Sequence, residues 1–182
     1  MKFVRDIIII IVAAIAICLA VNFTIETREV HSQSMLPDIE PGEHIIVSKA
    51  AYFFHPPERG EVIVFHSPRN PKSDLIKRII ALPGDTIEIE GHTVFVNDIP
   101  LVEPYISESP EYTFPFQEID ADHYFVLGDN RNSSSDSHKG WTVPRTNIVG
   151  KAWVTYWPPH RWHIIKHYFI DTSTQVTEDD KS

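Results

Sequence analysis

Two side chains of this 182-residue sequence could form a nucleophile and its base. Ser34 lies in the stretch 31–37, directly after an apolar N-terminal run. A serine hydroxyl becomes an effective nucleophile only when a base removes its proton. Lys77, within the stretch 74–80, is the candidate base, and a third polar cluster follows at 128–138. We therefore expect these three stretches to form one Ser–Lys active site.

Lys77 can act as a base only if its surroundings lower its pKa. A lysine ordinarily has a pKa near ~10.4 and is charged at neutral pH. Removal from water lowers that pKa, and four apolar neighbours could provide such a setting: Leu75, Ile76, Ile79 and Ile80. Adjacent strand residues face opposite ways, so one of Lys77 and Arg78 can point into a site and the other to solvent. Taken alone, the stretch favours an ordinary edge lysine with its head group in water.

The N-terminus predicts a membrane anchor in front of the site. Residues 7–21 are apolar without interruption, and Phe23 and Ile25 extend the run. As a helix, 7–25 would span about 28 Å, close to the ~30 Å hydrocarbon core of a bilayer. Lys2 and Arg5 favour a cytoplasmic location for residues 1–6.

Two other readings of the N-terminus compete with the anchor. One is a signal peptide cleaved after small residues such as Ala20, and another is a lipoprotein signal ending at Cys18. Ile17 is too large for the position before a lipoprotein cysteine. The run is also longer than most signal-peptide apolar regions, which favours an uncleaved anchor over 7–25.

The rest of the chain predicts a mainly β domain, a sheet or barrel, over 26–170. Short runs of branched residues alternate with Pro and Gly turns. Residues 86–96 suggest a hairpin around Gly91, and 100–117 is a polar excursion with interspersed aromatics. Residues 171–182 have the composition of a disordered tail. The remaining predicted strands are 43–47, 61–65, 124–127 and 148–156.

Composition excludes several classes of function. The net charge is −9 and no basic patch stands out, which argues against a nucleic-acid partner. The single cysteine, Cys18, leaves no intramolecular disulfide and no thiolate metal site. His160, His163 and His167 have helical spacing, but no acidic residue joins them. We therefore expect neither a metal nor another cofactor.

Four stretches together resemble the successive motif boxes of bacterial type I signal peptidases. Their order, their spacing and the preceding apolar run agree with that family, and the resemblance covers 2–158. It implies a signal-peptidase-like β-sheet or barrel domain behind one transmembrane helix. The stretches are Ser32-x-Ser34-Met35-x-Pro37, Arg59-Gly60-Glu61-Val62-x-Val64-Phe65, Ile76-Lys77-Arg78 with Leu82-Pro83-Gly84-Asp85, and Gly128-Asp129-Asn130-Arg131 with Ser134-x-Asp136-Ser137.

The resemblance assigns a role to each polar residue of the dyad. Ser34 would be the nucleophile, and Lys77 the general base that later protonates the leaving amine. The Ser34 backbone N–H and the Ser32 hydroxyl would form the oxyanion hole. The intermediate would be an acyl-enzyme on Ser34 that water hydrolyses. The implied function is a membrane-bound serine endopeptidase that removes N-terminal signal peptides from exported proteins.

The 128–138 stretch would support the dyad. By resemblance, Ser134 would hydrogen-bond and orient Lys77, Asp136 would support the loop of Ser134, and Asp129 and Arg131 would brace the same loop. Taken singly, such residues could equally be loop hydroxyls and turn formers that bond local backbone.

Two positions in this stretch depart from the family pattern. His138 stands where the family usually has Arg, and Ser133 where it usually has Asn. A neutral His offers at most one weaker bond in place of a bidentate Arg–carboxylate pair.

The resemblance also implies substrates with small residues one and three positions before the cut. Val30 and Ile76 would line shallow apolar pockets, with the substrate extended beside 74–77, although both could equally be core residues. The implied partners are signal-peptide-bearing preproteins, the lipid bilayer and the export translocon. Aromatic residues at 157–162 would enter the lipid head groups. The implied location is the cytoplasmic membrane, crossed once, with the N-terminus in the cytoplasm and the catalytic domain on the outer face.

Two other functions fit the same residues. One is a dedicated peptidase that matures a single pilin or conjugation protein with the same dyad. The other is a catalytically silent, anchored β-domain that binds exported chains, for which His138 is the only support.

Overall fold

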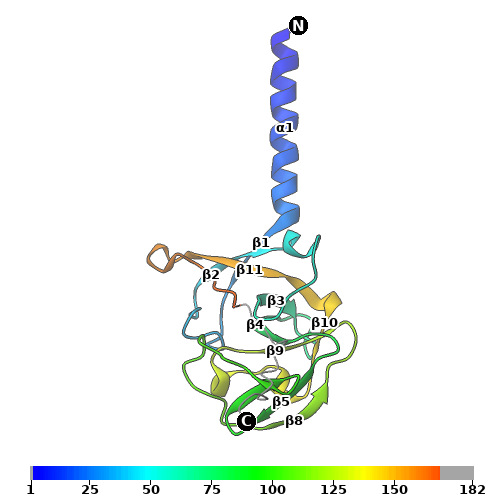
Figure 1. The fold of residues 1–182 in the computed structure, drawn as a ribbon. Helices are drawn as coiled ribbons and strands as arrows, with labels where there is room; N and C mark the ends of the chain where they lie inside the picture. Colours follow the sequence, from blue (N-terminus) through cyan, green and yellow to red (C-terminus); the bar gives the residue numbers. More distant parts are fainter. Residues whose placement is uncertain (1, 169–182) are drawn as a thin grey trace, which may run out of the picture.

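The computed structural model describes residues 2–168, and the side chains of all of these except 2, 4 and 17–22. Helix α1 (Lys2–Thr24) extends away from a β domain (Figure 1), and strand β1 (Ile25–Glu29) follows it directly. The large apolar side chains described on α1 are exposed, for example Ile10 at 68%. Among the described residues, no helix, α1 included, meets the length and hydropathy needed to cross a membrane. The anchor expected over 7–25 therefore stays a prediction.

The larger sheet carries the residues of interest and is antiparallel throughout. Its strand order is β1-β2-β11-β3-β4-β9-β10, and β12 pairs with β11. The predicted strands at 43–47, 61–65, 124–127 and 148–156 are confirmed within two residues. The bounds are β2 (His44–Ser48), β3 (Val62–His66), β4 (Asp74–Ala81), β9 (His123–Leu127), β10 (Val143–Pro144), β11 (Ile148–Trp157) and β12 (His163–Ile164).

A smaller antiparallel sheet lies at the end of the domain away from α1 (Figure 1). Its order is β7 (Ile99–Pro100), β6 (Thr93–Val96), β5 (Thr86–Glu90) and β8 (Phe114–Glu118). The predicted hairpin is confirmed, because Gly91 and His92, both with positive φ, connect β5 to β6. The expectation that 100–117 forms a loop or an inserted excursion is wrong at both ends, because Pro100 lies in β7 and residues 114–117 lie in β8. Pro115 is tolerated in β8 because β8 is an edge strand.

After α1, the helices in the described part of the chain are 3-10 turns of three residues each. His160 lies in one of them and His163 in β12, so helical spacing does not place these histidines on one face. The tail predicted at 171–182 lies outside the described residues. The bounds of the turns are η1 (Ala50–Tyr52), η2 (Arg131–Ser133), η3 (Ser137–Lys139), η4 (Arg145–Asn147) and η5 (Pro159–Arg161).

A cluster of buried apolar side chains lies beneath the turn that carries Ser34. Met35 and Ile39, on that turn, are fully buried against strands β2, β3 and β4. Burial of one such side chain contributes about 1.5–3 kcal/mol. The core therefore holds the turn rigidly next to β4, which carries Lys77. The other members of the cluster are Val30, Ile45, Val47, Val62, Val64, Ile76, Ala152 and Ile165.

Candidate active site

Ser34 lies on a tight turn that packing and backbone bonds hold in place. Within the turn, Leu36 N donates to Gln33 O and Ile39 N to Met35 O. Ser34 itself is 3% exposed. A second segment fixes the turn from outside, because Asn130 N donates to Ser34 O at 3.0 Å.

Lys77 is in contact with Ser34. It lies on β4 opposite Ile63 of β3 and is 2% exposed. Its Nζ donates to Ser34 Oγ at 2.5 Å and to Ile76 O at 2.7 Å. Burial lowers the pKa of Lys77 from 10.5 to about 8, against the opposing charges of Asp136 and Asp129. The two stretches singled out in the sequence thus meet in one buried pair, and the pKa of its lysine is lowered.

The Ser32 hydroxyl also lies at this pair. Its Oγ is 3.0 Å from Ser34 Oγ, and either atom can donate. Because Ser32 is exposed and Ser34 is buried, the hydroxyl lies at the open side of the pair. It is therefore available as a donor to an oxygen that develops negative charge beside Ser34.

Asp136 is the fully buried centre of the 128–138 loop. Its carboxylate accepts from Gly128 N at 2.9 Å, from His138 N at 3.3 Å and from His138 Nδ1 at 2.6 Å. Burial raises the pKa of Asp136, but the hydrogen bonds outweigh it and hold that pKa below its ordinary value. His138 therefore does bond Asp136, through one ring nitrogen.

Ser134 is placed beside this carboxylate and not bonded to Lys77. Its Oγ is near enough to Asp136 to help lower the pKa of that carboxyl. Within the described residues, however, the hydroxyl is buried and makes no hydrogen bond of good geometry. The hydrogen bond from Ser134 to Lys77 implied by the family resemblance is thus not formed here.

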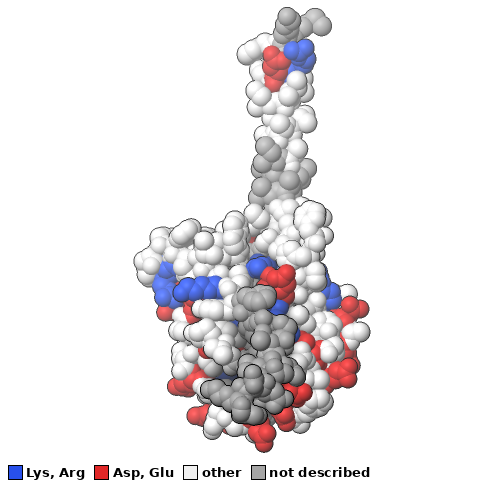
Figure 2. Space-filling model, viewed as in Figure 1, with Lys and Arg blue, Asp and Glu red and all other residues white. Residues whose placement is uncertain are grey.

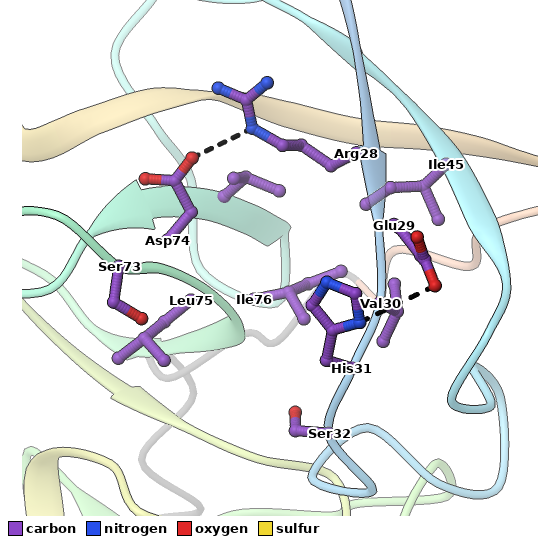
Figure 3. A pocket seen from close by; sticks show the side chains of 11 residues that line it. Arg28, Glu29, Val30, His31, Ser32, Ile45, Ser73, Asp74, Leu75 and Ile76 are labelled. Carbon is purple, nitrogen blue, oxygen red and sulfur yellow. Dashed lines mark hydrogen bonds and ion pairs between the residues drawn. The ribbon is translucent and has the colours of Figure 1, made fainter.

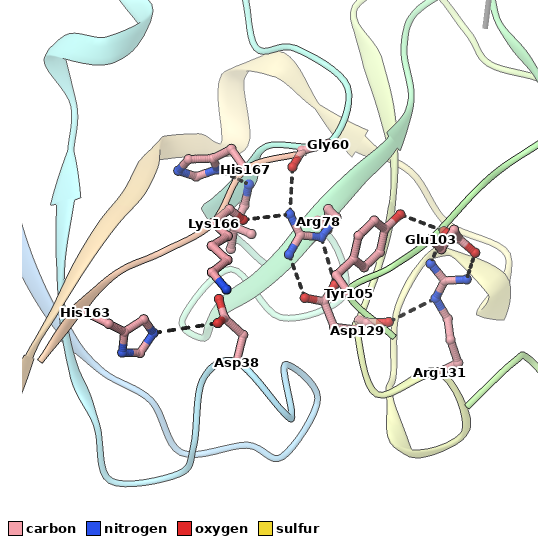
Figure 4. A network of polar contacts seen from close by, with 12 residues as sticks. Asp38, Gly60, Arg78, Glu103, Tyr105, Asp129, Arg131, His163, Lys166 and His167 are labelled. Carbon is pink, nitrogen blue, oxygen red and sulfur yellow. Dashed lines mark hydrogen bonds and ion pairs between the residues drawn. The ribbon is translucent and has the colours of Figure 1, made fainter. Parts of the chain in front are cut away.

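A buried ion pair joins β4 to the 128–138 loop (Figure 4). Arg78 Nε and Nη2 donate to the two oxygens of Asp129 at 2.9 and 2.7 Å, and both side chains are 1% exposed. Arg78 Nη1 also donates to Gly60 O at 2.7 Å. The expectation that one of Lys77 and Arg78 points to solvent is wrong, because β4 is covered on both faces. Asp129 braces β4 through this pair.

Arg131 braces the loop through a residue that sequence reasoning missed. Its Nε donates to Gly128 O at 3.2 Å, and its Nη1 to Glu103 at 2.6 Å. Its Nη2 bonds the other carboxylate oxygen of Glu103. Tyr105 completes the group, since its hydroxyl donates to Glu103 at 2.7 Å and its ring lies under the Arg78 guanidinium at 4.3 Å. The interspersed aromatics of 100–117 were the available signal that this segment packs against something.

A cavity of about 210 Å³ opens beside Ser32 (Figure 3). Val30 and Ile76 lie in its wall, as the resemblance implies, together with Ile45 and Val64. At its rim Arg28 Nε donates to Asp74 at 2.8 Å. The opening is therefore apolar within and charged at its edge.

Strand β4 has a free edge beside this cavity. Its residues Asp74–Arg78 pair with β3, whereas β9 pairs only with Arg78, Ile79 and Ala81. Within the described residues, no strand occupies the other edge of residues 74–76. An extended peptide can therefore join the sheet there.

The sequence of this chain is similar to those of known peptidases. The family described as "Signal peptidase, peptidase S26" matches residues 2–157. A signal peptidase I of Leptolyngbya laminosa is 45% identical over 147 residues, which cover 77% of this chain and 72% of that protein. A probable signal peptidase I-1 of Synechocystis is 39% identical, with 88% and 86% covered. Thylakoidal processing peptidase 1 of Arabidopsis thaliana is 35% identical, with 75% and 43% covered.

Among the described residues, no three His, Cys, Asp or Glu side chains are gathered so as to hold a metal ion. The family match over residues 2–157 and the signal peptidase I relatives show that the chain belongs to the peptidase S26 family and is a hydrolase that removes signal peptides.

Proposed function

We propose that Ser34 and Lys77 are the catalytic dyad of this peptidase. The observation that carries the proposal is the 2.5 Å contact between Lys77 Nζ and Ser34 Oγ in a buried setting. Neutral Lys77 takes the proton of Ser34 while Oγ attacks the scissile carbonyl carbon. The lysine then passes that proton to the leaving amine, and an acyl-enzyme remains on Ser34. Water, deprotonated by Lys77, hydrolyses this ester.

The altered pKa of Lys77 makes this role chemically accessible. With a pKa of about 8, roughly 10% of the lysine is neutral at pH 7. At the ordinary value of 10.5, only about 0.03% would be neutral, so burial enriches the base form by about 300-fold. An ordinary surface lysine would lack this advantage, and the buried position of Lys77 favours the catalytic role over the edge-lysine reading.

The oxyanion of the tetrahedral intermediate would be bound by the Ser34 N–H and the Ser32 hydroxyl. Ser32 bonds the nucleophile in the free enzyme at 3.0 Å, and a rotation of its hydroxyl would direct the proton to the oxyanion. Ser134 would remain available to Lys77, since its buried hydroxyl has no other bond of good geometry among the described residues.

We propose further that the substrate lies extended along the free edge of β4 and is cut after a small-x-small motif. In an extended peptide, residues one and three positions before the cut face the same side. Both would point to the wall formed by Val30 and Ile76. A cavity of about 210 Å³ shared by two side chains favours small apolar residues.

Attachment to a membrane is a separate part of the proposal. Apolar side chains of α1 are exposed along the helix, and α1 extends clear of the domain (Figure 1). In the face shown in Figure 2, acidic side chains gather mostly on the half of the domain farther from α1. Trp157 and Trp162, both more than half exposed, are suited to a lipid interface.

We propose that residues 7–25 anchor the chain in the cytoplasmic membrane, with 1–6 in the cytoplasm and 26–170 on the outer face. Preproteins would then reach the enzyme as they leave the export translocon. Deletion of residues 2–24 should release an active domain from membranes into the soluble fraction. A deleted chain that still sediments with membranes would contradict the anchor.

The decisive experiment is cleavage of a detergent-solubilised preprotein, with the cut site read by mass spectrometry. Ser34→Ala and Lys77→Ala should both be inactive, and the wild type should cut after a small-x-small motif. Lys72→Ala, which changes an exposed lysine nearby, is the matched control and should retain full activity. An active Lys77→Ala enzyme would refute the dyad. A wild type that cuts one preprotein only would favour the dedicated maturation peptidase, and one that binds but cuts none would favour the silent binder.

A further inference from the structure

We infer that Tyr112 is a positioning residue of the active site, acting through His138 to hold Asp136 and the loop that borders Lys77. Tyr112 lies in the segment 101–113, which joins β7 to β8 and supplies none of the groups assigned to the reaction. The inference rests on the proposed dyad, because its effect is read out on Lys77.

The first contact in this chain of restraints is the one between the ring of His138 and Asp136. This side chain is 7% exposed, and its Nδ1 is 2.6 Å from the fully buried Asp136 carboxylate. A guanidinium holds a carboxylate with two donors in a fixed plane, whereas one imidazole bond leaves the ring free to rotate about it. A single-bonded histidine therefore needs a second contact to hold its orientation.

Tyr112 provides that second contact. Its ring lies on the ring of His138 with centroids 4.0 Å apart and an interplanar angle of 19°. Stacked aromatic pairs of this kind have a preferred geometry. The Tyr112 hydroxyl is buried and has no hydrogen-bond partner among the described residues, so the ring and not the phenol makes the useful contact.

The 101–113 segment is itself fastened to the same loop. Arg131 holds Glu103 with two hydrogen bonds. Asn132 accepts from Glu111 N at 2.9 Å and donates to Ser109 O at 3.1 Å. The stack of Tyr112 on His138 is thus one of several contacts between the segment and the 128–138 loop.

From Asp136 the restraint reaches the dyad by two short routes. Gly128 N donates to Asp136 at 2.9 Å, and Gly128 lies directly against Ser34 O and Ser134. Asp136 also acts on Lys77 through its charge, as does Asp129. A shift of Asp136 would therefore move the Ser34 turn and change the field at Lys77.

The direction of that field change can be worked out. Asp136 raises the pKa of Lys77, and the bond from His138 partly neutralises Asp136. Loss of the stack weakens that bond and exposes Lys77 to more negative charge. The other charged groups that face Tyr112 are Arg131 and Glu103, which pair with each other. The alkaline rise of kcat should therefore move to higher pH.

The test compares Tyr112→Leu with Tyr112→Phe in the full-length enzyme on a preprotein substrate. We expect Tyr112→Leu to lower kcat about tenfold with KM within twofold, and to move the rise of kcat to higher pH. Tyr112→Phe keeps the ring and should remain within twofold of the wild type. In the Tyr112→Leu background, His138→Arg should restore most of the lost kcat, because a guanidinium holds Asp136 without a stacked ring.

Three results would overturn the inference. The first is a Tyr112→Leu enzyme with kcat within twofold of the wild type. The second is loss of kcat with an unmoved pH profile and no rescue by His138→Arg, which is the behaviour of a purely structural contact. If Tyr112→Leu does not fold, His138→Gln is measured in its place. The third contrary result is then a His138→Gln enzyme whose kcat depends on pH as in the wild type. The dyad is tested separately by Lys77→Ala, so the two failures are distinguishable.

Discussion

Gly128 is the point at which a single added methyl group should damage the reaction itself. A Cβ built on this residue would lie 2.5 Å from Ser34 O and 2.8 Å from Ser134 Cβ, and it would also clash with Ser134 Oγ. Non-bonded heavy atoms are comfortable only at about 3.5 Å. Ser134 can rotate away in part, but Ser34 O is backbone on a turn held by buried Met35 and Ile39. The turn would therefore have to move by about 1 Å to accept the methyl group.

That displacement has a calculable consequence for both stability and rate. Overpacking of this kind costs about 1–3 kcal/mol of folding free energy. A 1 Å misplacement of a reacting group can cost on the order of 100-fold in rate. Gly128→Ala should therefore lose stability moderately and kcat by about 100-fold, since the methyl group acts on the turn that carries Ser34.

Gly150→Ala is the matched control. Its Cβ would lie 2.5 Å from Ser48 O, across the pairing of β11 with β2, and would contact neither member of the dyad. It should lose a similar amount of stability and keep its kcat. The assay is kcat and KM on a preprotein substrate together with thermal unfolding of both variants. A Gly128→Ala enzyme with kcat within threefold of the wild type would refute the reasoning, as would an equal loss of kcat in both variants.

Because Lys77 acts as a base only when neutral, kcat should rise with pH through about 8, and a plateau already reached at pH 6 would argue against a lysine base. Lys77→Met should abolish cleavage yet raise the free energy of unfolding at pH 7 by roughly 1–3 kcal/mol, since it removes an ammonium that burial disfavours. The stability gain of Lys77→Met should shrink as pH rises from 8 to 10.5. In that range the wild type becomes more stable, because only its unfolded state still binds the proton. A Lys77→Met protein less stable than the wild type at pH 7 would contradict this prediction. Arg78→Met should lower the free energy of unfolding by about 3–5 kcal/mol, because it leaves Asp129 buried and unpaired. In denaturant titrations, the double variant Arg78→Met, Asp129→Leu should recover most of that loss. Equal losses in the single and double variants would contradict this prediction. Trp157→Ala combined with Trp162→Ala should weaken sedimentation with anionic vesicles, and unchanged binding would exclude these residues from the lipid interface.

Much of the architecture followed from local sequence patterns. Runs of branched residues between Gly and Pro turns predicted four strands of the larger sheet, because strand formation there depends on burial of an alternating or continuous apolar run. The β5–β6 hairpin was readable for the same reason, with Gly91 at a turn that requires positive φ. Strand β8 was not readable, because its Pro115 resembles a break until the pairing with β5 shows that it lies at an edge.

For the active site too, some properties followed from the sequence and others only from the fold. Residue types and motif order determined that Ser34 and Lys77 were the candidates for nucleophile and base, since that choice depends on chemistry carried by each residue alone. Only the tertiary structure decided that Lys77 is buried and touches Ser34, that Arg78 pairs with Asp129, and that Glu103 and Tyr112 of a supposed excursion support the loop. Burial, pKa and stacking depend on what other segments bring near a side chain. The segments that form these contacts are up to 51 residues apart along the sequence and meet only in the fold.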